Sequence, residues 1–185
     1  REANGATLPP VYQSSAFEQD TAADLEKIFE NKAPGYCYTR VGNPTVTAFE
    51  NRITKLEGGM ASIACASGMA AIMNAILNIV RSGDEIVSSA SLYGGSIDLF
   101  RDIEEFGIKT RYVKNNDWEA IEGAINEHTR LLFAETIGNP KLDVTDIEGV
   151  AAIAHKRGLP FLVDNTVATP YLINPLKLGA DVVIH

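Results

Sequence analysis

The sequence lacks several features that would direct its function elsewhere. No apolar run approaches the roughly 20 residues that a membrane-spanning helix needs. Basic residues are in the minority, since 16 lysines and arginines stand against 24 aspartates and glutamates and leave a net charge of −8. We therefore expect neither nucleic acid nor an anionic membrane as a partner, because both require a basic surface.

Cysteine is also scarce. Cys37 and Cys65 are the only two, and their spacing fits neither a metal site nor a redox motif. We predict two reduced thiols with structural roles in a cytoplasmic protein, and no metal site. The spacing of the dinucleotide-binding pattern G-x-G-x-x-G is missing as well.

The chain has two parts of different texture. Residues 1–59 are polar, rich in turns and weakly periodic, and we predict an extended N-terminal arm with helices over 21–30 and 45–57. In residues 60–185, short apolar runs alternate with amphipathic stretches. Such alternation predicts an α/β domain, with a mostly parallel sheet sandwiched by helices.

The expected strands and helices of this domain can be placed from the apolar runs. Strands are expected at 62–66, 85–88, 109–113, 130–134, 160–163 and 181–184, and helices at 68–81, 96–106, 118–125 and 146–157. Gly83, Gly107 and Gly158 each follow a helix, where a left-handed residue is favoured. Ligands of such sheets bind at the carboxyl ends of the strands, so candidate residues are sought there.

Ser67, Gly68 and Met69 form the first candidate group, in a turn of small residues between an expected strand and helix. Unpaired N–H groups at a helix start attract anions, Ser67 adds a hydroxyl, and Gly68 lets a phosphate come close. A plain N-cap role for Ser67 explains the same turn.

Asp164 and Thr166 follow an apolar strand directly. A carboxylate at that place suits a pyridine-ring cofactor, because it keeps the ring nitrogen protonated and the ring able to take up electrons. Thr166 would contact the ring edge or a phosphate. An ordinary turn or helix cap is the alternative for Asp164.

Three further segments supply candidates. Tyr93, followed by two glycines, has a ring that can stack on a flat cofactor, and Asn139 has an amide that can donate to a ligand oxygen. Arg40, close to Tyr38, has the forked guanidinium that suits phosphate. Each residue also has an ordinary explanation in packing, in a turn or in solvent. Four kinds of group nevertheless meet at predicted strand ends: a helix-start turn, an aromatic ring, an amide and a carboxylate.

Together these segments resemble the Cys/Met-metabolism family of pyridoxal-phosphate (PLP) enzymes. The resemblance covers essentially the whole chain and rests on the motifs LPPVYQSS (8–15), YTR (38–40), NPT (43–45), LEGG (56–59), SGMAA (67–71), LYGG (92–95), GNP (138–140) and VDNT (163–166). It implies PLP as the cofactor. It also implies fold type I of the PLP-dependent transferases, which is the aspartate aminotransferase-like fold.

The resemblance also implies roles for the candidate residues. The N–H groups of Gly68 and Met69 would bind the PLP phosphate, assisted by Thr166. Tyr93 would stack on the ring and assist catalysis, and Asp164 would pair with the pyridinium nitrogen.

The remaining candidates are tied by the resemblance to the substrate and to a second subunit. Asn139 would lie near the ring hydroxyl and the substrate carboxylate. Tyr38 and Arg40 would reach the phosphate of a neighbouring subunit, so the site would need at least a dimer. The family is typically a tetramer of two such pairs.

Within the family, residues 135–144 and 163–172 look most like the O-acetylhomoserine sulfhydrylase branch. Gly95 stands where methionine γ-lyases usually have a cysteine, which weighs against that branch. The implied reaction replaces the acetate of O-acetyl-L-homoserine by sulfide or a thiol, giving homocysteine or methionine. Cystathionine γ-synthase, cystathionine γ-lyase and methionine γ-lyase are the alternatives within the family.

The PLP-binding lysine of the family lies in a Ser-x-Thr-Lys motif, just after the position that His185 matches. None of the lysines of this chain lies in such a motif, so we assign none to that role. We expect the chain as printed to be catalytically inactive. A non-catalytic α/β binding or assembly module is the alternative from another class.

Overall fold

The structure is a computed structural model that describes residues 5–185. The chain forms two compact units, one of residues up to 55 together with 60–64, the other of residues 56–59 together with 65–185. The first unit holds α1 (Ala22–Phe29), whose N-cap Thr21 accepts a hydrogen bond from the N–H of Asp24. Helix α2 (Pro44–Glu57) begins in the first unit and ends in the second.

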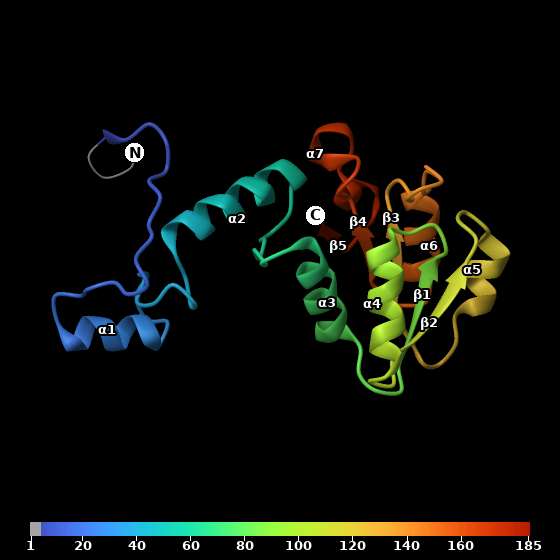
Figure 1. Cartoon of the computed structure of the whole chain (residues 1–185), viewed down its shortest axis with the longest axis horizontal. Helices are drawn as coiled ribbons and strands as arrows, with labels where there is room; N and C mark the ends of the chain where they lie inside the picture. The colour runs from blue at the N-terminus through green and yellow to red at the C-terminus, as the bar shows by residue number, and fades with distance from the viewer. Residues whose placement is uncertain (1–4) are drawn as a thin grey trace. The chain divides into compact units, whose positions relative to one another are not determined.

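The second unit is built on one parallel sheet, with the strand order β2-β1-β3-β4-β5 (Figure 1). Its strands are β1 (Glu85–Ser89), β2 (Lys109–Val113), β3 (Thr129–Glu135), β4 (Phe161–Asp164) and β5 (Val182–Ile184). Its longer helices are α3 (Gly68–Ile79), α4 (Gly94–Glu104), α5 (Trp118–Ala124) and α6 (Ile147–Lys156). The predicted parallel α/β architecture is confirmed.

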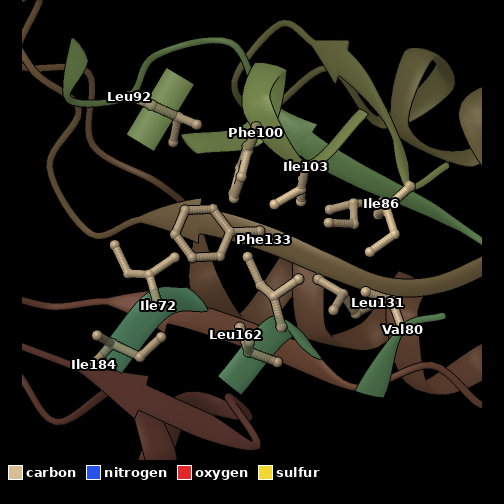
Figure 2. Packing of buried hydrophobic residues seen from close by; sticks show 12 residues of the cluster. Ile72, Val80, Ile86, Leu92, Phe100, Ile103, Leu131, Phe133, Leu162 and Ile184 are labelled. Atoms are coloured by element: carbon tan, nitrogen blue, oxygen red, sulfur yellow. The ribbon is translucent and has the colours of Figure 1, made fainter. Parts of the chain in front are cut away.

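Apolar residues on both faces of the sheet hold the helices in place. Along β3, Leu131 and Phe133 pack with α3 and α4 on one face, while Leu132 and Ala134 pack with α5 and α6 on the other. Figure 2 shows the first of these layers, in which the rings of Phe100 and Phe133 meet edge to face with their centroids 5.0 Å apart. The alternation follows from the strand period of two, and it gives the predicted sandwich.

The order of the strands creates a switch in the direction of winding. β1 leads through α4 to β2 on one side, whereas β2 leads through α5 to β3 on the other side of β1. In open parallel sheets, ligands bind outside the carboxyl ends of the strands at such a switch point. The loops after β1 and β3 are therefore the natural walls of a site.

Some local expectations are confirmed and others are wrong. Gly83, Gly107 and Gly158 have positive φ, of 92°, 81° and 67°, as predicted. Residues 62–66 are not a strand. No strand among the described residues pairs with this segment and Ile63 is 85% exposed, whereas a strand needs a hydrogen-bonded neighbour.

Two short helical segments follow β4 without having been predicted, α7 (Thr169–Leu172) and a 3₁₀ turn (Pro175–Leu178). Four residues are too few to show a helical period. Within residues 5–185, no helix combines the length and the apolar character that crossing a bilayer requires. The two cysteines are free thiols.

A buried carboxylate at the amino end of β1 gives a testable stability effect. Hydrogen bonds from Arg111, and then from Asn126, lower the pKa of Glu85 to about 2. Because this pKa lies below the ordinary value of 4.5, the interaction stabilises the fold above that value and is lost as the pH falls toward 2. We expect Glu85→Gln to lower the free energy of unfolding by about 2 kcal/mol at neutral pH.

Urea unfolding of the Glu85→Gln variant and of the parent at pH values near 7 and near 3 measures this effect. The difference in stability should shrink strongly at the lower pH. An equal difference at both values would show that the loss comes from packing and not from the charge of Glu85.

Candidate functional site

Four strand ends, those of β1, β3, β4 and β5, lie side by side at the carboxyl edge of the sheet. The backbone N–H of Tyr93, after β1, donates to Oε1 of Glu135 at the end of β3, with 2.6 Å between the two atoms. Glu135 is the register partner of Asp164 on β4, and Asp164 is that of Ile184 on β5. Neighbouring strands are about 4.8 Å apart. The structure therefore brings Tyr93 and Asp164 to one edge.

The start of α3 lies at the same edge. A Cβ placed on Gly68 would be 3.3 Å from the carbonyl oxygen of His185, the residue after β5. Ser67 is the N-cap, and its Oγ accepts a hydrogen bond from the N–H of Ala70. The N-cap interpretation is thereby confirmed. The N–H groups of Gly68 and Met69 have no acceptor within the helix, so the cap leaves both available to an anion.

Removal of this cap gives a second stability prediction. We expect Ser67→Ala to lower the free energy of unfolding by about 1 kcal/mol, because the N–H of Ala70 loses its acceptor. Ser67→Thr keeps a capping oxygen and is the matched control. Thermal unfolding followed by far-ultraviolet circular dichroism measures both variants. Equal losses for alanine and threonine would contradict the cap interpretation.

Asp164 is held with one oxygen engaged. Its Oδ1 accepts hydrogen bonds from the N–H and the Oγ1 of Thr166, at 2.9 and 2.5 Å. No donor among the described residues is bonded to its Oδ2. The carboxylate is therefore oriented by the chain while one oxygen stays available to a ligand. The hydroxyl of Thr166 is turned to Asp164, so its predicted contact with a cofactor stays a prediction.

Tyr93 and Asn139 lie on the loops after β1 and β3. Tyr93 is the N-cap residue of α4, and its side chain is 52% exposed. Asn139 is exposed in a loop closed by the bridge between Ile137 and Val144. The two loops also touch, since a Cβ on Gly138 would lie 2.6 Å from the carbonyl oxygen of Ser91.

Tyr38 and Arg40 belong to the first unit. The guanidinium carbon of Arg40 lies 5.4 Å from the centroid of the Tyr38 ring, within the range of a cation–π contact. Their predicted role at the site of a neighbouring subunit stays a prediction.

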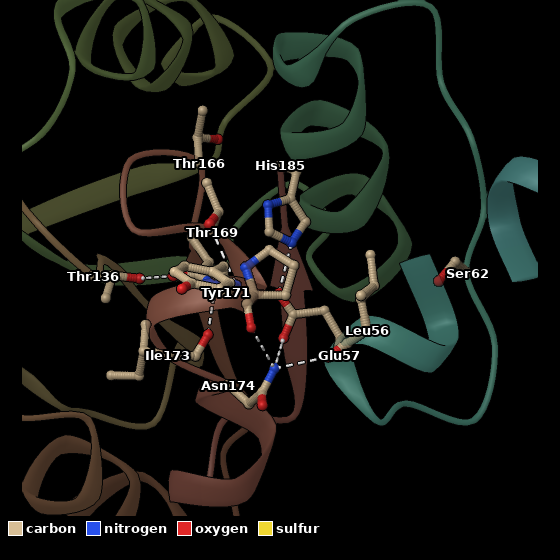
Figure 3. A network of polar contacts seen from close by, with 12 residues as sticks. Leu56, Glu57, Ser62, Thr136, Thr166, Thr169, Tyr171, Ile173, Asn174 and His185 are labelled. Atoms are coloured by element: carbon tan, nitrogen blue, oxygen red, sulfur yellow. Dashed lines mark hydrogen bonds and ion pairs between the residues drawn. The ribbon is translucent and has the colours of Figure 1, made fainter. Parts of the chain in front are cut away.

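A polar network that joins the ends of β3, β4 and β5 was not predicted (Figure 3). Glu57 Oε1 contacts Nε2 of His185 at 2.7 Å and accepts a hydrogen bond from Nδ2 of Asn165 at 3.1 Å. Asn165 in turn accepts from the hydroxyl of Thr136 at 2.8 Å. The network anchors the segments after β3, β4 and β5. The motif LEGG contains Glu57, yet it carries no local sign of this role.

Glu135 is the other residue that sequence reasoning missed. It is 5% exposed, and burial raises its pKa to about 7, with a further contribution from the charge of Asp164. Its position at the end of an apolar strand was visible, but its bond to Tyr93 spans 42 residues of sequence.

Comparison with known proteins shows which family has this arrangement of residues. Residues 1–185 match the family described as "Cys/Met metabolism PLP-dependent enzyme". The chain belongs to this family. A curated relative, the O-acetyl-L-homoserine sulfhydrylase of Leptospira meyeri, is 45% identical over 177 residues, which cover 95% of this chain and 40% of the relative. The L-methionine γ-lyase of Pseudomonas putida is 43% identical over 182 residues, which cover 98% of this chain and 46% of the relative.

A solved structure supports the same assignment for the fold. A Campylobacter jejuni protein assigned as an O-acetylhomoserine (thiol)-lyase is 35% identical, with a TM-score of 0.89, over 94% of this chain and 43% of that chain. That protein carries N′-pyridoxyl-lysine-5′-monophosphate. The chain of this Cys/Met-metabolism protein thus has fold type I, and it spans less than half the length of the three relatives.

PLP, the cofactor of the Cys/Met-metabolism family, fits the groups present at the edge of the sheet. The N–H groups of Gly68 and Met69 would suit its phosphate, and the available oxygen of Asp164 would suit its ring nitrogen. The exposed ring of Tyr93 would suit the face of its pyridine. These groups come from the start of α3, the end of β4 and the N-cap of α4, which meet at one edge of the sheet.

Proposed function

We propose that this chain is the cofactor-binding part of a PLP-dependent enzyme that replaces the acetate of O-acetyl-L-homoserine by sulfide or a thiol. The observation that carries the proposal is the oriented carboxylate of Asp164, at the same sheet edge as the start of α3 and Tyr93. The products would be homocysteine or methionine.

The residues of the chain divide the work between binding and electrostatics. PLP, when bound, supplies a ring that accepts electrons from the substrate. Asp164 would keep a proton on the ring nitrogen, and the start of α3 would hold the phosphate. Tyr93 would fix the plane of the ring and assist proton transfer with its hydroxyl. Asn139 would orient the substrate carboxylate.

The second candidate is methionine γ-lyase, which the Pseudomonas relative favours at a similar level of identity. The geometry around Gly95 supports the sulfhydrylase instead. A Cβ at this position would lie 2.5 Å from Cε1 of the Tyr93 ring, so any side chain, cysteine included, would force the ring to move. The observed position of Tyr93 therefore depends on glycine at position 95.

An assay of the full-length gene product with PLP separates the two candidates. We expect homocysteine from O-acetylhomoserine and sulfide, at a rate far above that of methanethiol release from methionine. The reverse order would identify a γ-lyase. A protein that stays colourless with added PLP would contradict both.

The assembly is part of the proposal. We propose a homo-oligomer, a dimer of dimers, in which Tyr38 and Arg40 of one subunit bind the phosphate at the site of the next. Arginine suits phosphate through its positive charge and through the two parallel N–H donors of its planar guanidinium. We also propose a cytoplasmic enzyme that acts on small amino-acid substrates. Light scattering of the gene product measures the number of subunits.

A further inference from the structure

A second acidic residue lies at the cofactor edge of the sheet and has no part in the function proposed above. Glu135 ends β3, is 5% exposed, and lies opposite Asp164 in the strand register. It stands at the switch point between β1 and β3, where the loops of the candidate site begin. A buried carboxyl group at this position needs a structural reason, and its hydrogen bond to Tyr93 supplies one.

The contact of Glu135 with Tyr93 resembles a helix cap supplied from another element. In a capping box, a glutamate inside the helix reaches back to the N–H of the N-cap residue. Helix α4 has Ser96 at that position, and its N-cap Tyr93 makes no side-chain capping bond. Glu135 of β3 accepts the hydrogen bond from the N–H of Tyr93 instead, at 2.6 Å.

The two residues after Tyr93 favour a hydrogen bond from another element to its backbone. Gly94 and Gly95 follow directly, and glycine leaves the backbone more freedom than any other residue. The neighbouring stretch is fixed by other contacts, because Ser91 Oγ donates to Asp143 Oδ2 at 2.9 Å. The Tyr93 carbonyl accepts hydrogen bonds from the N–H groups of Ser96 and Ile97 within α4. The bond to Glu135 is the contact that ties the Tyr93 N–H to a different element, β3.

The charge state of Glu135 is compatible with this task. Burial, the largest cause, and the charge of Asp164 raise its pKa, the backbone N–H groups of Tyr93 and Asn139 lower it, and the resulting pKa is about 7. Near neutral pH, a large fraction of Glu135 is therefore uncharged. Asp164 is then the main negative charge offered to a ring nitrogen at this edge.

We propose that Glu135 is a positioning residue, whose buried carboxyl holds the backbone of Tyr93 and so sets the height and tilt of its ring over the cofactor. The inference rests on the proposed function, since the position of the Tyr93 ring matters only if a flat cofactor binds beneath it. Glu135 touches neither cofactor nor substrate in this scheme.

The test uses the full-length gene product, freed of cofactor and titrated with PLP. We expect Glu135→Ala to weaken PLP binding by about tenfold, the effect of one lost hydrogen bond in a buried place. We also expect it to reduce the visible circular dichroism that the bound cofactor acquires from its fixed surroundings. Glu135→Gln keeps an oxygen for the N–H of Tyr93 and should restore both signals to within about threefold of the parent.

Glu85→Gln is the matched control, because Glu85 is a buried carboxylate at the opposite end of the same sheet. It should lose stability and leave PLP affinity and dichroism unchanged. If the alanine variant does not fold, Glu135→Asp replaces it, since the shorter side chain withdraws the oxygen from Tyr93, and the same loss is expected.

The outcomes separate the inference from the proposed function. A parent protein that does not bind PLP refutes the proposed function. A parent that binds PLP, together with an alanine or aspartate variant of equal affinity and dichroism, overturns the role of Glu135 alone. Equal losses in the glutamine and alanine variants also overturn it, because they would show that the hydrogen bond to Tyr93 is not what matters.

Discussion

Replacement of Asp164 by asparagine in the full-length gene product is expected to lower the turnover of O-acetylhomoserine by about 10²–10³-fold. Asparagine keeps the size of the side chain and an oxygen for Thr166, so the local structure should persist. It removes the negative charge that would keep a proton on the ring nitrogen, and a neutral ring takes up electrons less readily. The measurement is kcat with saturating PLP, alongside the absorbance of the bound cofactor.

The matched control for this variant is Asp181→Asn. Asp181 lies just before β5, at the other end of the sheet, where its carboxylate accepts a hydrogen bond from the N–H of Phe161 at 2.8 Å. The same chemical change there should leave kcat within about twofold of the parent, as for a site without contact to the reaction. Equal activity of the Asp164 variant and the parent would sink the proposed role of Asp164.

The second large effect concerns the pH dependence of stability. Glu135 has an ordinary pKa of 4.5, which the fold raises to about 7. Between these values the unfolded chain loses its proton while the folded chain keeps it, so the stability due to this group falls as the pH rises. The fall amounts to about 3 kcal/mol and is complete above the folded-state value.

Glu135→Gln removes this titration. Relative to the parent, the variant should therefore gain stability as the pH rises from about 5 to about 8, by up to roughly 3 kcal/mol. Urea unfolding of the cofactor-free proteins at several pH values gives the difference directly. A difference that does not change with pH would show that Glu135 keeps an ordinary pKa in the fold.

The sequence allowed the sheet and its two covering layers to be predicted, because each strand carries its own apolar pattern. In β3, Leu131 and Phe133 face one layer and Leu132 and Ala134 the other, so a continuous apolar run indicated a strand buried on both sides. The segment 62–66 has the same local pattern and is not a strand. What differs is the presence of a pairing neighbour, which local sequence does not reveal.

The candidate site was predictable to the extent that its groups follow strands. Asp164 ends β4 and Tyr93 follows β1 by four residues, and parallel strands bring such positions to one edge. Gly68 begins α3 and follows no strand, so its place at this edge does not follow from the same argument. The supporting contacts were not predictable. Asn165 meets Glu57 across 108 residues of sequence, and His185 meets it across 128, so these partners become visible only when the sheet is assembled.

The apolar layers that hold the sheet are distinct from most of the residues at its carboxyl edge. Tyr93, which is 52% exposed, and the exposed Asn139 lie beyond the ends of β1 and β3, whereas the apolar layers pack along the strands. Exchange of Gly95, the second residue of α4, would therefore move the ring of Tyr93 and leave the apolar layers in place. The edge that would meet the cofactor can thus be altered without any change to the apolar interior of the domain.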